Sequence, residues 1–203
     1  MGKKDQIAVI LLAAGESSRM RQPKQLLPWG DTTLLGHAIK VAQDSNAQDV
    51  YVVLGGHAQT IQEQLDLSHI KCILNKNWKK GLGTSIACAV KHLAHAHKAY
   101  DGLLFMLGDQ PLIDAQVLNT MLRAFSQGNK GMVATKYPQG NGTPVLFHKK
   151  FFGFLKELDG DKGAKEIIAN NSDDVIALAP DGKEVDLDTY AEYQQLKQQL
   201  KPR

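Results

Sequence analysis

A run of small residues ends the first apolar stretch of the chain, and three cations follow it. Positions 11–20 read LLAAGESSRM, and Arg19, Arg21 and Lys24 lie within or just beyond this run. Backbone N–H groups of such a turn form a concave anion site, and arginine and lysine neutralise phosphate oxygens. The pattern indicates a polyphosphate site. The alternative is a purely steric turn with solvated cations, because glycine and alanine also let a backbone bend closely.

This turn matches neither of two common phosphate-binding motifs. The P-loop pattern GxxxxGK[ST] does not occur, and Gly15 stands alone without the other glycines of GxGxxG. A nicotinamide dehydrogenase is therefore disfavoured. Pro23 fixes the backbone just ahead of Lys24, which would hold that ammonium in one place.

Acidic residues follow at two other places. Asp109 comes directly after a buried apolar run, and Asp186 and Asp188 alternate in an extended segment, so that both point the same way. Carboxylate oxygens suit Mg²⁺, which usually takes one or two protein carboxylates plus substrate phosphates. The alternatives are that Asp109 is a turn or cap residue before Pro111, and that Asp188 belongs to a cap of the last helix.

Glycine-rich segments recur elsewhere along the chain. Gly83, Thr84 and Ser85 open a helix of small residues, where a flat ring could lie close to the backbone, although an N-capped helix explains the pattern equally well. Further glycine-rich segments occur at 55–57, 140–144 and 160–164. Ligands of open α/β sheets bind at the carboxyl ends of the strands. We therefore expect these segments to line one cleft together with the first turn.

Short apolar runs alternate with segments of helical periodicity. The predicted strands are 7–13, 49–54, 71–74, 102–107, 131–137, 144–148 and 174–178. The predicted helices are 33–44, 57–65, 83–97, 114–127, 149–158, 162–170 and 189–199. Such alternation predicts right-handed βαβ units and a mostly parallel sheet with helices on both faces. Near-continuous apolar strands are typical of a parallel sheet.

Length and composition favour one soluble α/β domain over residues 1–203. A net charge of +3, with scattered basic residues, argues against a nucleic-acid partner. Cys72 and Cys88 have no metal-like spacing and suggest free thiols in a reducing compartment. No apolar run approaches the roughly 20 residues of a membrane span. We interpret the first apolar run as a strand rather than a signal peptide, and expect a cytoplasmic protein.

The motifs taken together resemble the MobA-like family of nucleotidyltransferases, most closely its molybdenum cofactor cytidylyltransferase branch. The matching segments are LLAAGESSRM with K24 and LLPWG, GLGTSIACAV, GDQP, GNGTPVLF, GDKGAK and DLDT. Ala13-Ala14-Gly15 resembles the cytidylyl rather than the guanylyl branch. Departures are Arg21 in place of a usual glycine and Thr84 in place of a usual serine. The resemblance implies a three-layer α/β/α, Rossmann-like, mostly parallel sheet of the nucleotide-diphospho-sugar transferase type.

The resemblance implies CMP transfer from CTP to the terminal phosphate of molybdopterin, with Mg²⁺ at Asp109 and Asp188 and Asp186 as auxiliary. Lys24 and Arg19 would be catalytic alongside Asp109. Nucleotide contacts are implied for Leu12, Ala13, Ala14, Gly15, Ser17, Ser18, Gly55, Gly83, Thr84, Ser85 and Gly108. Acceptor contacts are implied for Gly142, Thr143, Pro144, Asp161 and Gly163.

The product would serve a client molybdenum hydroxylase of the xanthine dehydrogenase type. Two alternatives stay open at this point. One is a relative that uses GTP or another acceptor, and the other is a non-catalytic carrier that delivers the finished cofactor.

Overall fold

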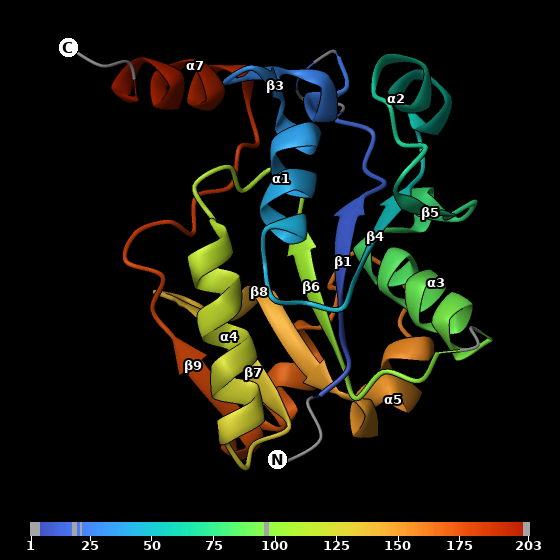
Figure 1. Ribbon diagram of the computed structural model, residues 1–203, viewed down its shortest axis with the longest axis vertical. Coiled ribbons are helices and arrows are strands. Elements are labelled where there is room, and N and C mark those ends of the chain that lie inside the picture. Colours follow the sequence, from blue (N-terminus) through green and yellow to red (C-terminus); the bar gives the residue numbers. More distant parts are fainter. Residues whose placement is uncertain (1–4, 18–19, 21, 96–97, 201–203) are drawn as a thin grey trace.

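The central sheet has seven strands in the order β5-β4-β1-β6-β8-β7-β9 (Figure 1). The computed structural model describes residues 5–17, 20, 22–95 and 98–200, and all structural statements refer to these. The strands are β1 (Ile7–Ala13), β4 (Asp49–Leu54), β5 (Lys71–Leu74), β6 (Gly102–Leu107), β7 (Met132–Tyr137), β8 (Gly140–His148) and β9 (Val175–Leu178). All run parallel except β8, which pairs antiparallel with both β6 and β7.

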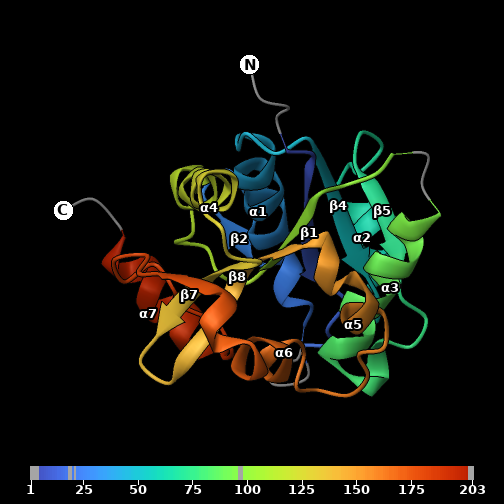
Figure 2. The ribbon, with the colours of Figure 1, turned by 90° about the horizontal axis from the view of Figure 1, so that it is seen from below.

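Helices cover both faces of this sheet. They are α1 (Leu34–Gln43), α2 (Ala58–Gln64), α3 (Leu82–Ala94), α4 (Ala115–Gln127), α5 (Phe152–Lys156), α6 (Lys165–Asn170) and α7 (Tyr190–Gln199). Apolar residues of α1, α2 and α4 pack in one core and those of α3, α5 and α6 in another. Figure 2 shows α1 and α4 on one side of β1 and α3, α5 and α6 on the other. Every residue of β1 is buried as a result. The predicted three-layer α/β/α architecture is confirmed.

The direction of β8 corrects the expectation for residues 140–144. We predicted a glycine-rich loop followed by a strand from 144, but these residues already belong to β8. The strand departs from regular pairing opposite Ala134 and Thr135, and the Thr143–Pro144 peptide is cis. Because β8 runs against its neighbours, its beginning lies at the carboxyl edge of the parallel strands. The segment reaches the expected cleft as a strand rather than as a loop.

Several helix boundaries also differ from prediction. The segment 149–158 is a 3-10 turn, Lys149–Phe151, followed by the short helix α5. Helix α6 begins at Lys165 rather than 162, because Gly163 adopts φ +58°, outside the helical region. Two two-residue strands, β2 (Pro28–Trp29) and β3 (Thr32–Thr33), form a small hairpin that the sequence did not predict.

The last helix packs against this hairpin. The Tyr193 hydroxyl donates a hydrogen bond of 2.6 Å to the Pro28 carbonyl, and Trp29 and Leu187 are buried in the same small cluster. The hairpin and α7 together hold the segment 186–189 against the carboxyl edge of the sheet. Among the described residues, no helix is both long enough and apolar enough to cross a membrane.

Candidate active site

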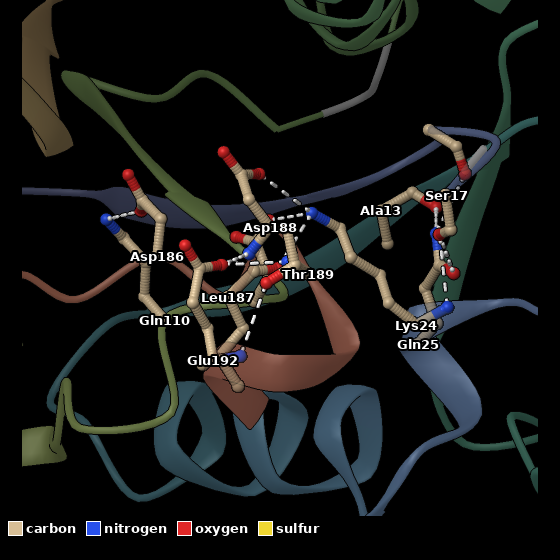
Figure 3. A network of polar contacts seen from close by, with 12 residues as sticks. Ala13, Ser17, Lys24, Gln25, Gln110, Asp186, Leu187, Asp188, Thr189 and Glu192 are labelled. Carbon is tan, nitrogen blue, oxygen red and sulfur yellow. Dashed lines mark hydrogen bonds and ion pairs between the residues drawn. The ribbon is translucent and has the colours of Figure 1, made fainter. Parts of the chain in front are cut away.

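The turn after β1 is fixed from behind by one buried side chain. The Gln25 amide nitrogen donates to the carbonyls of Ala13 and Gly15, each at 3.0 Å (Figure 3). The Ser17 hydroxyl donates to the Gln25 amide oxygen at 3.2 Å and accepts from the Lys24 backbone N–H at 3.0 Å. Gln25 is only 3% exposed, and we did not predict it as a site residue. The turn is thus held in one shape, with Gly15 exposed toward solvent.

Lys24 projects from this region toward two aspartates. Its ammonium forms an ion pair with Asp109 Oδ2 and lies 3.9 Å from Asp188 Oδ1. It also donates to the Leu187 carbonyl at 3.4 Å (Figure 3). The Leu187 N–H in turn donates to the Asp109 carbonyl at 3.1 Å, which ties the segment 186–189 to the end of β6. The structure therefore brings together Lys24, Asp109 and Asp188.

Asp109 is well shielded from solvent. Its side chain is 12% exposed, and its second oxygen, Oδ1, is buried without a hydrogen-bond partner. A buried carboxylate oxygen that lacks a donor is costly, so such an atom points to a role beyond folding. It supplies a hard oxygen ligand at a place where the Lys24 ammonium now provides the positive charge.

Asp186 takes part in a separate network. Its carboxylate accepts a 2.8 Å hydrogen bond from the Gln110 amide nitrogen (Figure 3). The same nitrogen donates to the Tyr137 hydroxyl at 2.7 Å. Tyr137 donates to the Thr143 carbonyl at 2.6 Å. Partial burial and repulsion from Asp109 and Asp188 raise the pKa of Asp186. Burial and the negative charge of Asp186 raise the pKa of Tyr137 to about 12, so its hydroxyl stays protonated.

A cavity of about 710 Å³ opens over the first turn. The predicted residues that line it are Leu12, Ala13, Ala14, Gly15, Lys24, Ser85, Gly108 and Asp109. Asp161, predicted as an acceptor contact, also lines it, and the other lining residues are Glu16, Gln25, Trp78, Lys79, Gly81, Leu82 and Leu107. Trp78 and Lys79 were missed, although both lie in the stretch that precedes the predicted small-residue helix. Predicted residues from separate strands and loops thus meet at one cavity wall, as expected for the carboxyl ends of parallel strands.

Other predicted nucleotide contacts lie behind that wall. A Cβ added to Gly55 would stand 2.6 Å from the Ala14 carbonyl oxygen, so Gly55 lets β4 approach the first turn closely. The Thr84 hydroxyl donates to the Gly81 carbonyl at 2.8 Å and accepts from Asn75 at 3.0 Å. Ser17 is used within the turn. These residues shape the cavity, whereas Ser18, Arg19 and Arg21 lie outside the described residues.

The glycines at the start of α3 make room for backbone. The Gly83 N–H donates to the Gly160 carbonyl at 2.8 Å, and a Cβ on Gly83 would stand 2.8 Å from the Asp159 carbonyl oxygen. We expected these small residues to admit a flat ring. Instead the loop at 159–161 occupies that space, and Ser85 is the residue of the predicted trio that reaches the cavity.

A second cavity, of about 610 Å³, adjoins the first because Leu82, Leu107 and Asp161 line both. Its wall is largely apolar, with Ile86, Phe105, Val145, Phe147, Ala164, Ile168 and Ala169. Gly142 and Thr143, both predicted acceptor contacts, line it, as do Lys162, Lys165 and Asp186. The predicted contacts Pro144 and Gly163 are buried and do not line it.

The acidic residues fit a divalent cation only in part. Within the described chain, no group of three or more histidine, cysteine or acidic side chains is arranged to hold a metal ion. Asp109 and Asp188 nevertheless flank one position, and Mg²⁺ is commonly held by one or two carboxylates with phosphate oxygens completing its shell. The donor set and the unpartnered Asp109 Oδ1 suit a cation that arrives with a nucleotide.

The sequence matches the family described as MobA-like NTP transferase domain over residues 9–175. Among curated proteins, it is 29% identical over 171 residues to the bifunctional protein GlmU of Pseudomonas fluorescens. That match covers 82% of this chain but 36% of GlmU, so the chain spans about a third of the length of such relatives.

Solved structures extend the likeness to nearly the whole chain. Protein Rv0371c of Mycobacterium tuberculosis superposes with a TM-score of 0.83 at 32% identity, covering 95% of this chain and 98% of that one. A structure of Rv0371c in complex with manganese has a TM-score of 0.79 at 31% identity and covers 96% of this chain and 98% of that one.

Proposed function

Because the chain belongs to the MobA-like NTP transferase domain family, we propose that it transfers CMP from CTP to the terminal phosphate of molybdopterin, releasing pyrophosphate. The observation that carries this proposal is the pair of adjoining cavities at the carboxyl edge of the sheet. One is lined by an anion-binding turn, Lys24 and Asp109, and the other is largely apolar with lysines beside it. A nucleotide and a second, flatter substrate suit these two chambers.

The second cavity favours a heterocyclic acceptor that carries an anion. The half-buried Tyr137 ring contributes aromatic surface, and Lys162 and Lys165 supply positive charge. Phe105 and Phe147 are fully buried and back the apolar wall. A sugar phosphate would prefer a wall rich in hydrogen-bonding groups, whereas a pterin presents flat apolar faces. The GNGTPVLF segment, which together with GDKGAK strengthens the resemblance to the molybdopterin branch, supplies Gly142, Thr143, Val145 and Phe147 of this wall.

The transfer forms one P–O–P bond and breaks another. An acceptor phosphate oxygen attacks the α-phosphorus of CTP, and the bond to the β-phosphate oxygen breaks, so pyrophosphate carries away the electron pair. Both partners are anionic, so the barrier is largely one of repulsion and positioning. Lys24 would stabilise charge that grows on the α-phosphoryl oxygens, and N–H groups of the turn at 13–16 would hold the nucleotide. No general base is required, because the attacking phosphate is already ionised.

A divalent cation fits beside these residues. Asp109 and Asp188 would hold it, with Asp186 as an auxiliary, and the manganese complex of Rv0371c supports a cation site in this family. When bound, the ion supplies charge neutralisation to the phosphates. We propose Mg²⁺ as the ion used in the cell.

The experiment is pyrophosphate release from each of the four ribonucleoside triphosphates, with molybdopterin, a sugar 1-phosphate or no acceptor, in Mg²⁺ buffer. We expect release only with CTP and molybdopterin together. Release with GTP and molybdopterin would show that the protein transfers a guanylyl rather than a cytidylyl group. Release with the sugar 1-phosphate would show that the acceptor is a sugar phosphate rather than molybdopterin. No release under any condition would favour a carrier that binds the finished cofactor.

We propose a molybdenum hydroxylase of the xanthine dehydrogenase type as the client of the product.

A further inference from the structure

The Lys24 ammonium is already engaged by protein oxygens. It pairs with Asp109 Oδ2, donates to the Leu187 carbonyl at 3.4 Å, and lies 3.9 Å from Asp188 Oδ1, close enough for an ion pair but not for a hydrogen bond. The Lys24 side chain is only 20% exposed and Asp109 only 12%, so water screens this pair weakly. In this structure the Lys24 ammonium is therefore held by Asp109 within the cavity that both residues line.

We propose that Lys24 and a divalent cation compete for Asp109, and that a nucleotide resolves the competition by drawing the ammonium onto its phosphates. This inference rests on the proposed function only in taking the ligand to be a metal-bound nucleoside triphosphate. Lys24 thus has two alternative partners, Asp109 before the nucleotide binds and a phosphate afterwards.

Charge and geometry both support this exchange. Two cations at adjacent sites on one carboxylate repel each other strongly where water is scarce. The Lys24 backbone is held by the Ser17 hydroxyl and follows Pro23, so only the side chain is left to move. The same side chain lines the cavity together with Ala14 and Gly15, so rotation of its flexible stem carries the ammonium from Asp109 toward that turn.

The competition sets the order of affinities. A cation alone must displace Lys24 without offering it another partner, so it binds weakly. A nucleotide supplies that partner, and the cation then finds Asp109 available. By linkage, the nucleotide raises cation affinity by the same factor as the cation raises nucleotide affinity.

The test is a titration of the full chain with Mn²⁺ alone. Binding is measured by calorimetry and, independently, by the loss of the electron paramagnetic resonance signal of free Mn²⁺. We expect Lys24→Gln to bind Mn²⁺ at least about tenfold more tightly than the unmodified chain in the absence of nucleotide. Lys79→Gln is the matched control, because Lys79 lines the same cavity but stacks over the Trp78 ring at 5.4 Å. Lys79→Gln removes the same charge but leaves Asp109 paired with Lys24, so its increase in Mn²⁺ affinity should be clearly smaller than that of Lys24→Gln.

A second variant keeps the test decisive if Lys24→Gln folds poorly. Lys24→Arg retains the positive charge and offers Asp109 a two-pronged contact, so its Mn²⁺ affinity without nucleotide should be equal to or weaker than that of the unmodified chain. Equal gains for Lys24→Gln and Lys79→Gln, or tighter Mn²⁺ binding by Lys24→Arg, would overturn the proposal. These measurements use no acceptor and no turnover. Their outcome therefore does not depend on whether CTP and molybdopterin are the substrates.

Discussion

Asp109 combines burial, a charged partner and an orphaned oxygen in one side chain. Asp109→Asn keeps the shape but removes the charge that would hold a cation and orient Lys24. We expect turnover in the pyrophosphate assay to fall by at least about a hundredfold, the usual cost of losing one electrostatic stabiliser. An unchanged far-ultraviolet circular dichroism spectrum would serve as the folding control. Near-normal turnover would remove Asp109 from the catalytic residues.

Gln25 acts at the same scale but through backbone. Gln25→Met has a similar length and leaves the carbonyls of Ala13 and Gly15 without their donor. We expect the free energy of unfolding to fall by about 1–3 kcal/mol, the usual cost of unsatisfied buried groups, together with a higher KM for CTP. Urea denaturation measures the first effect. Gln22→Met, at an exposed glutamine nearby, is the matched control and should change little; equal effects of the two variants would count against the role assigned to Gln25.

At the scale of elements, the close approach of α3 to the loop at 159–161 positions the wall shared by both cavities. Gly83→Ala would place a methyl group 2.8 Å from the Asp159 carbonyl oxygen, which is backbone and cannot rotate away. We expect the loop to shift, with reduced thermal stability and lower turnover. Both are measured on the purified variant by thermal denaturation and pyrophosphate release.

The matched control for that prediction is Gly153→Ala in α5. A Cβ there meets nothing within 4 Å, so alanine introduces no steric clash. Because alanine has the better helix propensity, we expect the free energy of unfolding to rise by about 0.5–1 kcal/mol. If Gly83→Ala behaved like Gly153→Ala, the contact between α3 and the loop would not govern the site.

At the scale of the whole molecule, an ionic cluster far from the cavity ties three segments of the sheet together. Asp49, at the start of β4, pairs with Lys71 at 2.7 Å and Lys98 at 2.5 Å and accepts from the Tyr100 hydroxyl at 2.8 Å. Burial by itself would raise the pKa of Asp49, but these hydrogen bonds outweigh it and lower that pKa to about 2.

Because the pKa of Asp49 in the folded chain lies below its unfolded value of 3.8, the contribution of Asp49 to stability depends on pH. The contribution is fully present above that unfolded value and disappears as the pH falls through about 2. We expect Asp49→Asn to be less stable than the unmodified chain near neutral pH, and the difference to shrink across this acidic window. Urea denaturation over a pH series measures it. A difference that stayed constant down to the lowest pH would contradict the assignment.

Local patterns predicted the strands well. The bounds of β1, β4, β5 and β6 agree with the sequence prediction at both ends. For β1 and β6 the reason is that a run apolar on both faces needs no tertiary information to be recognised as a buried strand. The ends of α5 and α6 were less predictable. Both helices are short, so their apolar periodicity does not mark where they begin. In addition, the positive φ of Gly163, which delays the start of α6, has no signature in the periodicity.

The structure places several predicted site residues side by side, while their roles stay predictions. Turn residues Ala13 to Gly15, Lys24 and Asp109 do share one cavity, because the carboxyl ends of parallel strands meet at one edge. Gln25 and Trp78 were missed because neither residue type signals a site by itself. Gln25 is recognisable only once its amide is seen to reach two carbonyls of another segment.

The order and spacing of neighbouring residues were enough to predict the class of fold and the turn of small residues after β1, because both follow from short-range patterns. The tertiary structure alone decided which charges meet: that Lys24 reaches Asp109 across 85 positions of the chain, that β8 reverses direction, and that a loop rather than a ligand fills the space beside Gly83. The physical reason is that a hydrogen bond or an ion pair depends on separation in space. Chain spacing fixes that separation within a turn or a strand, but packing fixes it between them.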